Sequence, residues 1–286
     1  MVRRGLITKI ISNQYTVNCD NNLYLCTPRG KFRNLKQDLI VGDLVEINPQ
    51  TNTIDNVLAR NNYLDRPPVA NIDIALIVTS VKKPMLSLTL LDKLISIITI
   101  NKIKPIICLT KLDLCSKEEL KSINIISDYY KKIGYEVVDN TMINKILQIL
   151  KGKVVVVTGQ TGAGKSSLLN KIDPQLNLKT SPISDALGRG VHTTRHVEIF
   201  DVKGIHFIDT PGFSAIDFNN VSIDELKDSF IEFKNYKCKY QDCNHDKEDN
   251  CSIKINVLNN NILESRYNNY LQFKKEIYES SGKLYK

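Results

Sequence analysis

The most constraining feature of this chain is a P-loop pattern that directly follows the apolar run at residues 154–157. Its residues are Gly159, Gln160, Thr161, Gly162, Ala163, Gly164, Lys165 and Ser166. Successive backbone N–H groups in such a loop form a concave anion site at the start of a helix. We expect Lys165 to reach the outer phosphates of a nucleotide and Ser166 to bind Mg²⁺, with Ser167 beside them.

A second motif, upstream of the P-loop, predicts which base the nucleotide carries. Thr110, Lys111, Leu112 and Asp113 follow an apolar run at residues 106–109 and match the pattern [N/T]-K-x-D. The Asp113 carboxylate can accept from both N1–H and the exocyclic amine of guanine, a donor pair that adenine lacks. The Lys111 stem can lie over the purine face. The motif therefore predicts GTP and GDP as ligands.

A third motif, D-x-x-G, begins at Asp209 and ends at Gly212. We expect Asp209 to hold Mg²⁺ through water and the Gly212 N–H to contact the γ-phosphate. Residues 188–195 occupy the place of the first switch loop, in which a threonine hydroxyl completes the Mg²⁺ shell. The spacing leaves Thr193 and Thr194 open for this role, and we favour Thr194.

The residue after D-x-x-G bears on catalysis. Many GTPases have a water-orienting glutamine there, whereas this chain has Phe213, so we expect slow intrinsic hydrolysis. His192 in the switch loop is the best internal candidate for the missing function, because a neutral imidazole can accept a proton from water. An RNA contact or a plain loop position is the alternative for His192. Lys165 and Thr194 complete the predicted catalytic set.

The motifs occur in a rotated order. The guanine-recognition motif comes first, and the P-loop, the switch loop and D-x-x-G follow, whereas a conventional GTPase carries the guanine motif last. A sheet tolerates opening of the chain at a new point, so the order predicts a circular permutation. The chain after Asp209 then leads directly into the C-terminal segment.

The flanking segments predict a multidomain protein. Residues 1–62 contain five short alternating strands, which fit an OB-type β-barrel, with an SH3-like barrel as the alternative. Residues 63–218 alternate strands with helices and predict a P-loop α/β domain, a parallel sheet with helices on both sides. Residues 219–286 are polar and end in a predicted helix over residues 262–280.

The C-terminal segment also carries a metal-ligand pattern. Three cysteines and one histidine fall within 14 residues, and they are Cys238, Cys243, His245 and Cys251. Three thiolates and one imidazole suit a closed, tetrahedral, structural Zn²⁺ site. A disulfide or free thiols are the alternative. We expect the segment to be too polar to bury a core of its own, so that metal binding supplies its folding energy.

Charge and composition indicate the surroundings of the protein. The formal net charge of +8 suggests a polyanionic partner such as RNA, with solubility as the plain alternative. No apolar run is long enough to span a membrane, and the N-terminus does not resemble a signal peptide. We expect a cytoplasmic monomer without membrane contact.

The permuted motif order, the N-terminal barrel and the Cys/Cys/His/Cys cluster together resemble the RsgA (YjeQ) family of GTPases that depend on the small ribosomal subunit. The resemblance covers essentially the whole chain. It implies a slow GTPase, stimulated by the small (30S) subunit, that binds its rRNA and acts late in its maturation. It also favours catalysis by His192. The family usually has a Ser-Ala pair in the guanine-site loop, where this chain has residues 137–140, Val-Val-Asp-Asn.

Two other classes of function compete with this interpretation. One is a GTP-dependent binding switch in translation or signalling, in which hydrolysis is incidental. The other is a kinase or ATPase that uses the same P-loop, and Asp113 argues against it.

Overall fold

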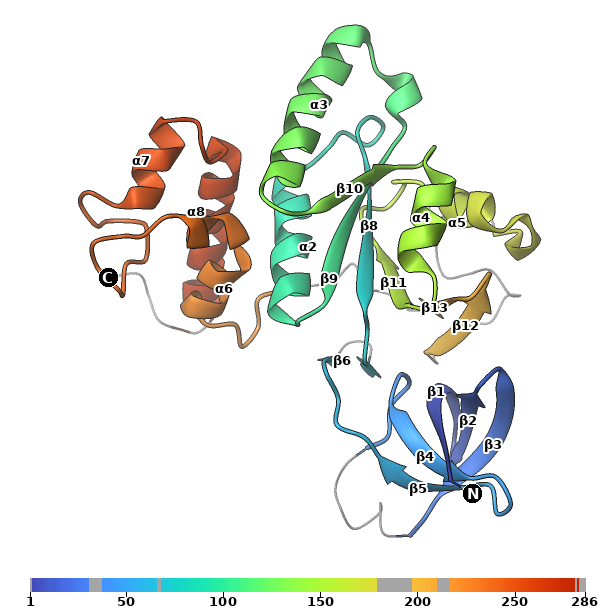
Figure 1. Cartoon of the computed structure of the whole chain (residues 1–286). Coiled ribbons are helices and arrows are strands. Elements are labelled where there is room, and N and C mark those ends of the chain that lie inside the picture. Colours follow the sequence, from blue (N-terminus) through green and yellow to red (C-terminus); the bar gives the residue numbers. More distant parts are fainter. Residues whose placement is uncertain are drawn as a thin grey trace.

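The computed structural model describes residues 2–30, 38–65, 68–178, 197–209, 217–280 and 282, and only the backbone of Asp65 and Asp209 (Figure 1). Several predicted residues lie outside these ranges. They are His192, Thr193, Thr194, Gly212 and Phe213.

The N-terminal strands form a closed barrel. The strands are β1 (Arg3–Ile11), β2 (Gln14–Cys19), β3 (Asn22–Pro28), β4 (Leu44–Asn48) and β5 (Thr53–Val57). They pair in the order β1-β2-β3-β5-β4, and β4 pairs back onto β1 to close the barrel. Alternate side chains point inward and form a separate apolar core that includes Ile7, Val17, Cys26, Val45 and Ile54. The expectation of an OB-type barrel is confirmed.

The centre of the molecule is a mixed sheet with the order β10-β9-β8-β11-β13-β12. Its strands are β8 (Ile74–Ser80), β9 (Lys104–Thr110), β10 (Glu136–Asp139), β11 (Val154–Thr158), β12 (Glu198–Val202) and β13 (Ile205–Asp209). All neighbouring pairs are parallel except β12 and β13. The prediction of a fully parallel sheet is wrong for β12, because a two-residue turn at Lys203 and Gly204 joins it to β13 as a hairpin.

Helices cover both faces of this sheet, as the alternation of elements predicted. On one face lie α2 (Leu88–Ile100) and α3 (Lys117–Lys132), whose apolar side chains pack on Ala75 and Ile77 of β8. On the other face lie α4 (Ile143–Leu150) and α5 (Lys165–Ile172), packed on Leu76 and Val78. Every residue of β8 is buried, as expected of a strand covered on both sides.

The barrel and the central sheet are joined by hydrogen bonds as well as by the chain. Strand β1 pairs with β12 at Lys9 and Glu198, whose side chains form an ion pair at 2.8 Å. The hairpin of β6 (Tyr63–Asp65) and β7 (Pro68–Ala70) lies between the two bodies. The result is one continuous sheet of eleven strands, which sequence patterns did not predict.

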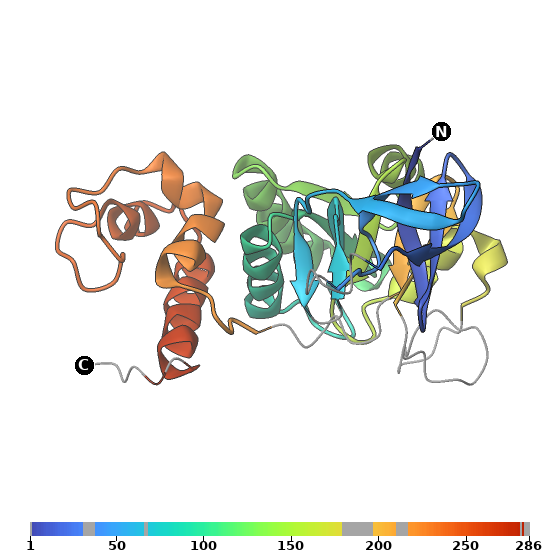
Figure 2. The same ribbon diagram turned by 90° about the horizontal axis from the view of Figure 1, so that it is seen from below.

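The C-terminal helical unit, residues 217–280, stands beside α2 (Figure 2). It contains α6 (Ile223–Ser229), the 3₁₀ helix η3 (Ile231–Asn235), α7 (Ser252–Leu258) and α8 (Glu264–Ser280). These elements enclose an apolar core rich in aromatic rings, including Phe230, Phe233, Tyr270 and Phe273. The expectation that this segment buries no core is therefore wrong. Its apolar residues are spread over several short elements, so no long periodic pattern marked them.

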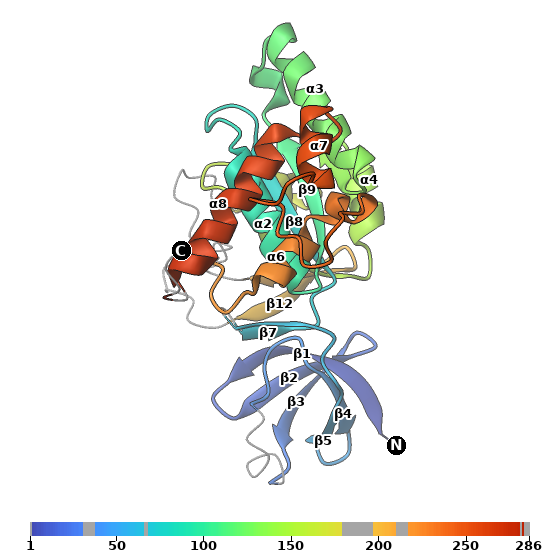
Figure 3. The same cartoon turned by 90° about the vertical axis from the view of Figure 1, so that its left-hand side faces the viewer.

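A buried network of charges attaches this unit to the central helices. Helix α8 lies against α2 (Figure 3), and its Arg266 is fully buried. The Arg266 guanidinium donates to both carboxylate oxygens of Glu232 at 2.8 and 2.9 Å, and to Asp92 of α2 at 2.8 Å. Asp92 also accepts from Asn269 of α8 and from Tyr130 of α3. Every charge in the network is paired, as burial requires.

We predict that Arg266→Met destabilises the protein by about 3–5 kcal/mol, because it leaves two buried carboxylates without a counter-charge. Urea unfolding followed by circular dichroism measures the change. Lys275→Met is the matched control on the same helix, since Lys275 forms only an exposed pair with Glu279, and we expect about 0.5 kcal/mol or less. Equal losses in the two variants would contradict the role of the network.

Candidate nucleotide and metal sites

The central sheet brings the predicted nucleotide motifs to one edge. The strands β9, β11 and β13 are connected through parallel pairs, so their carboxyl ends, at Thr110, Thr158 and Asp209, face the same way. Ligands of open α/β sheets bind outside this edge, where loops leave the strands. The guanine motif begins at Thr110 and the P-loop follows Thr158, so two segments about 50 residues apart in the chain meet here.

The P-loop has the backbone that its glycines permit. Gly159, Gly162 and Gly164 have φ values of 131°, 76° and 93°, which side-chain-bearing residues rarely adopt. A Cβ on Gly159 would overlap the carbonyl oxygen of Val78, so the loop packs directly against β8. Helix α5 begins at Lys165 immediately after the last of these glycines, and its first N–H groups are directed at the loop.

The P-loop lysine is half-buried and folded back on its own loop. The Lys165 ammonium donates to the carbonyl oxygens of Gly159 and Gln160 at 2.8 and 3.0 Å. Burial lowers the pKa of Lys165. Ser166 and Ser167 follow in the first turn of α5, and Ser166 is half-buried. A phosphate in the loop can replace both carbonyl contacts with a charged partner for the ammonium.

The guanine motif is bonded to the P-loop through its first two side chains. The Thr110 hydroxyl donates to the carbonyl oxygen of Ala163 at 2.6 Å, and the Lys111 ammonium donates to that of Gly162 at 2.8 Å. Asp113, in the 3₁₀ turn η1 (Leu112–Leu114), is exposed, so its carboxylate is available to a base. The first residue of the motif, Thr110, thus makes a side-chain contact that joins the two motifs.

A further loop, which no sequence motif marks, contacts the guanine motif in the structure. Residues 81–87 follow β8, and the carbonyl oxygen of Lys83 in this loop accepts a second bond from Lys111. Lys82 donates to both carboxylate oxygens of Glu119 at 2.9 and 2.8 Å, which ties the loop to α3. Its position after a buried strand beside β9 was the only sequence signal available.

Residues 137–140, with the sequence Val-Val-Asp-Asn, lie beside the end of β9, but the first three of them belong to strand β10 and only Asn140 lies beyond it. Strand β10 ends at Asp139, and the Asn140 N–H donates to the carbonyl oxygen of Leu109 at 3.0 Å. Asp139 accepts from the Thr141 N–H at 2.8 Å, which closes the turn. The end of β10 and the turn after it therefore lie next to the end of β9, where the guanine motif begins.

Only the backbone of Asp209 places the switch side of the site, at the end of β13. The assignments of His192, Thr193, Thr194 and Gly212 fall outside the described residues and stay predictions.

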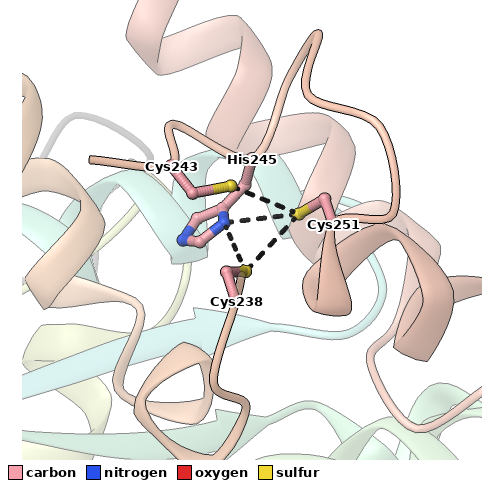
Figure 4. A group of neighbouring side chains, drawn as sticks. All are labelled: Cys238, Cys243, His245 and Cys251. Atoms are coloured by element: carbon pink, nitrogen blue, oxygen red, sulfur yellow. Dashed lines mark hydrogen bonds between the residues drawn. The ribbon is translucent and has the colours of Figure 1, made fainter. Parts of the chain in front are cut away.

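The four predicted zinc ligands lie together (Figure 4). The ligand atoms of Cys238, Cys243, His245 and Cys251 all lie within 4.8 Å of one another. Nδ1 of His245 is 3.4 Å from Sγ of Cys251 and 3.5 Å from Sγ of Cys238, so Nδ1 is the nitrogen that faces the thiols. Burial lowers the pKa of His245 to about 4, which keeps its imidazole neutral and able to bind a metal.

Residues outside the cluster hold its backbone in place. The Glu248 carboxylate accepts from the N–H groups of Asn244 and Asp246 at 2.7 and 2.9 Å. Tyr267 and Tyr270 of α8 donate to the carbonyl oxygens of His245 and Asn244 at 2.7 and 2.8 Å. The cluster is therefore fixed to the same helix that carries Arg266.

In the part of the chain that the structure describes, every helix is too short or too polar to cross a membrane.

Comparison with known proteins relates nearly the whole chain to one family. A family model for the RsgA N-terminal domain matches residues 4–55, and one for RsgA GTPase matches residues 57–219. A relative from Oceanobacillus iheyensis, "Small ribosomal subunit biogenesis GTPase RsgA 2", is 43% identical over 283 residues, which cover 96% of this chain and 97% of the relative. A relative from Staphylococcus aureus, "Small ribosomal subunit biogenesis GTPase RsgA", is 41% identical and covers 96% of this chain and 98% of its own.

Two solved structures share the fold. YjeQ from Thermotoga maritima superposes with a TM-score of 0.83 at 33% identity, over 99% of each chain. YloQ, described as a circularly permuted GTPase, superposes with a TM-score of 0.85 at 31% identity, over 100% of this chain and 97% of its own.

Proposed function

The chain belongs to the RsgA GTPase family, and on that premise we propose that it hydrolyses GTP during maturation of the small ribosomal subunit. Binding to that subunit stimulates the reaction. The names of its relatives support this role, since they are small ribosomal subunit biogenesis GTPases.

One observation carries the assignment of the nucleotide. Thr110 and Lys111 of the guanine motif are hydrogen-bonded to the P-loop carbonyls of Ala163 and Gly162. The group that recognises the base and the loop that holds the phosphates are therefore fixed relative to each other. A guanine nucleotide that spans both elements is bound in one defined orientation, which catalysis requires.

The switch residues supply the rest of the proposed mechanism. Ser166, Thr194 and Asp209 would hold Mg²⁺, and the ion would neutralise charge that develops on the phosphates. Lys165 contributes a second positive charge there. His192 positions the attacking water in place of the glutamine that Phe213 replaces. The half-buried Lys165 beside the P-loop carbonyls supports its part in this scheme.

The metal cluster is proposed to hold one structural Zn²⁺. Three thiols and one neutral imidazole on an ordered backbone fit a closed tetrahedral site, and a closed set leaves no position for chemistry. The ion would lock the loop that carries Cys243 and His245 onto α8.

We further propose a separate role for each of the three parts of the chain. The barrel (residues 1–62) and the C-terminal unit (residues 219–286) contact the subunit and its rRNA, and residues 63–218 carry the GTPase site. The net charge of +8 supports an RNA partner. The protein acts as a cytoplasmic monomer on this partner.

The main prediction concerns stimulation. Purified protein hydrolyses GTP slowly, and added small ribosomal subunits raise the turnover number by about 10²-fold, the usual contribution of one positioned acid–base group. Phosphate release measured with small subunits, with large subunits and with ATP in place of GTP tests it. Equal stimulation by large subunits would contradict the partner, and equal use of ATP would contradict the base.

A second prediction concerns His192. His192→Ala lowers the stimulated turnover number by about 10²- to 10⁴-fold and leaves GTP affinity unchanged, since the imidazole acts only on water. His206→Ala is the control. His206 lies near the start of β13, at the end of the sheet away from the P-loop, and its ring faces Asp201. Full stimulated activity in His192→Ala would remove this residue from the mechanism.

A third prediction concerns the metal. Purified protein contains one zinc per chain, and Cys243→Ser lowers both the zinc content and the urea midpoint of unfolding, because metal binding is coupled to folding. Elemental analysis and unfolding curves measure the two effects. Cys115→Ser, at a part-exposed thiol away from the cluster, is expected to change neither. Full stability after zinc removal by a chelator would argue against a structural ion.

A further inference from the structure

The edge of the central sheet opposite the nucleotide motifs carries an exposed group of lysines. They stand before or at the start of β9, before β11, and in the turn between β12 and β13. We call this group the basic edge, and its members are Lys102, Lys104, Lys151, Lys153 and Lys203. All five side chains are exposed.

Backbone hydrogen bonds place the segments that carry these lysines side by side. The Lys104 N–H donates to the carbonyl oxygen of Asp73, and the Asp73 N–H donates to that of Val154. The Lys153 carbonyl accepts from the His206 N–H at 2.9 Å. Just before β11, the Gly152 N–H donates to the carbonyl oxygen of Gly204, in the turn between β12 and β13, at 2.7 Å. The row crosses from β9 to β13, about 14 Å at the usual strand spacing.

The row has uncompensated positive charge. Among the described residues, no carboxylate lies within ion-pair distance of any of the five ammonium groups. The two acids in the row, Asp73 and Asp201, instead accept from the backbone N–H groups of Val154 and Gly204. Five lysines and two carboxylates give the edge a charge of about +3 in a chain of +8.

Two of the lysines occupy backbone positions that do not favour lysine. Lys102 and Lys203 have φ values of 58° and 54°, in the left-handed region that glycine and asparagine adopt at less cost. The turns themselves therefore do not explain lysine at these places. The chain accepts a small conformational cost at both, which points to a use for the side chains.

The edge is open and lies on the side of the barrel. A Cβ on Gly152 or Gly204 would meet no atom within 4 Å. Figure 1 places the barrel beneath the end of the sheet where β8 begins, and Asn62 of the connecting segment donates to the carbonyl oxygen of Lys102. A long ligand on the basic edge can therefore reach the barrel without covering the P-loop.

We propose that the basic edge binds the sugar-phosphate backbone of RNA, as a contact surface separate from the nucleotide site; the identity of the polymer as rRNA rests on the proposed function. Lysine ammonium groups bind phosphates through charge and without base specificity, and each contact releases counter-ions. The surface positions the RNA along the open end of the sheet, between the barrel and the central helices.

The double variant Lys102→Asn/Lys203→Asn tests the proposal. Asparagine suits the left-handed backbone, so the melting temperature is unchanged or higher while two charges are lost. The probe is small-subunit rRNA transcribed in vitro, titrated with full-length protein at several salt concentrations. We expect weaker binding at low salt, and a slope of log K against log salt that is shallower by about 1.4–1.8, the value for two phosphate contacts.

The control removes the same charge elsewhere. Lys117→Gln/Lys121→Gln changes two exposed lysines of α3, and we expect rRNA affinity within about twofold of wild type, because these lysines lie outside the row. The proposal is overturned if the edge variant keeps wild-type affinity and salt slope, or if the α3 variant loses as much. Naked rRNA binding needs no GTP hydrolysis. A wild-type protein that small subunits do not stimulate therefore rejects the proposed function, not the RNA-binding edge.

Discussion

The functional site depends on the parallel pairing of β8 with both of its neighbours. Strand β8 is hydrogen-bonded to β9 along its whole length and to β11 on its other side, and all of its residues are buried. This pairing aligns the ends of β9 and β11, so the guanine motif and the P-loop meet although the chain visits them in rotated order. Sheet pairing depends on which strands lie side by side and not on where the chain starts, which is why the permutation preserves the site.

The C-terminal unit packs on the helices beside the guanine motif, and the chain connects it to the end of β13, on the Mg²⁺ side of the predicted site. Arg266 bonds it to Asp92 of α2, and Tyr130 of α3 shares the same carboxylate, so it is anchored to the two helices that flank β9. The chain enters the unit from the end of β13, where Asp209 stands. The unit is thus packed beside the guanine motif and is continuous in the chain with the strand that carries Asp209. Its Cys/His cluster is held against α8 by Tyr267 and Tyr270.

The two edges of the central sheet both offer positively charged groups, but they differ in how enclosed those groups are. The carboxyl edge presents N–H groups, a half-buried lysine and glycines to a small phosphate ligand, whereas the amino edge presents five exposed lysines in a row. A nucleotide is enclosed by close backbone contacts, and a polymer requires an open surface with charges at intervals. One sheet can therefore serve both ligands without competition, with the barrel extending the open side.

Short local patterns were enough to predict the chemistry of the chain: the P-loop, the guanine motif and the set of metal ligands are each recognised by residue type and spacing alone. The sequence also predicted the barrel, the helices that cover the central sheet and helix α8, because alternation and helical periodicity are local signals, but it did not predict the short helices α6 and α7. Four features became visible only in the folded chain. They are the antiparallel β12, the burial of Arg266 between Asp92 and Glu232, the contact of Lys83 with the guanine motif and the row of lysines. Each of these joins residues from distant segments, and such pairings are fixed by how the strands and helices pack and leave no periodic trace in the chain.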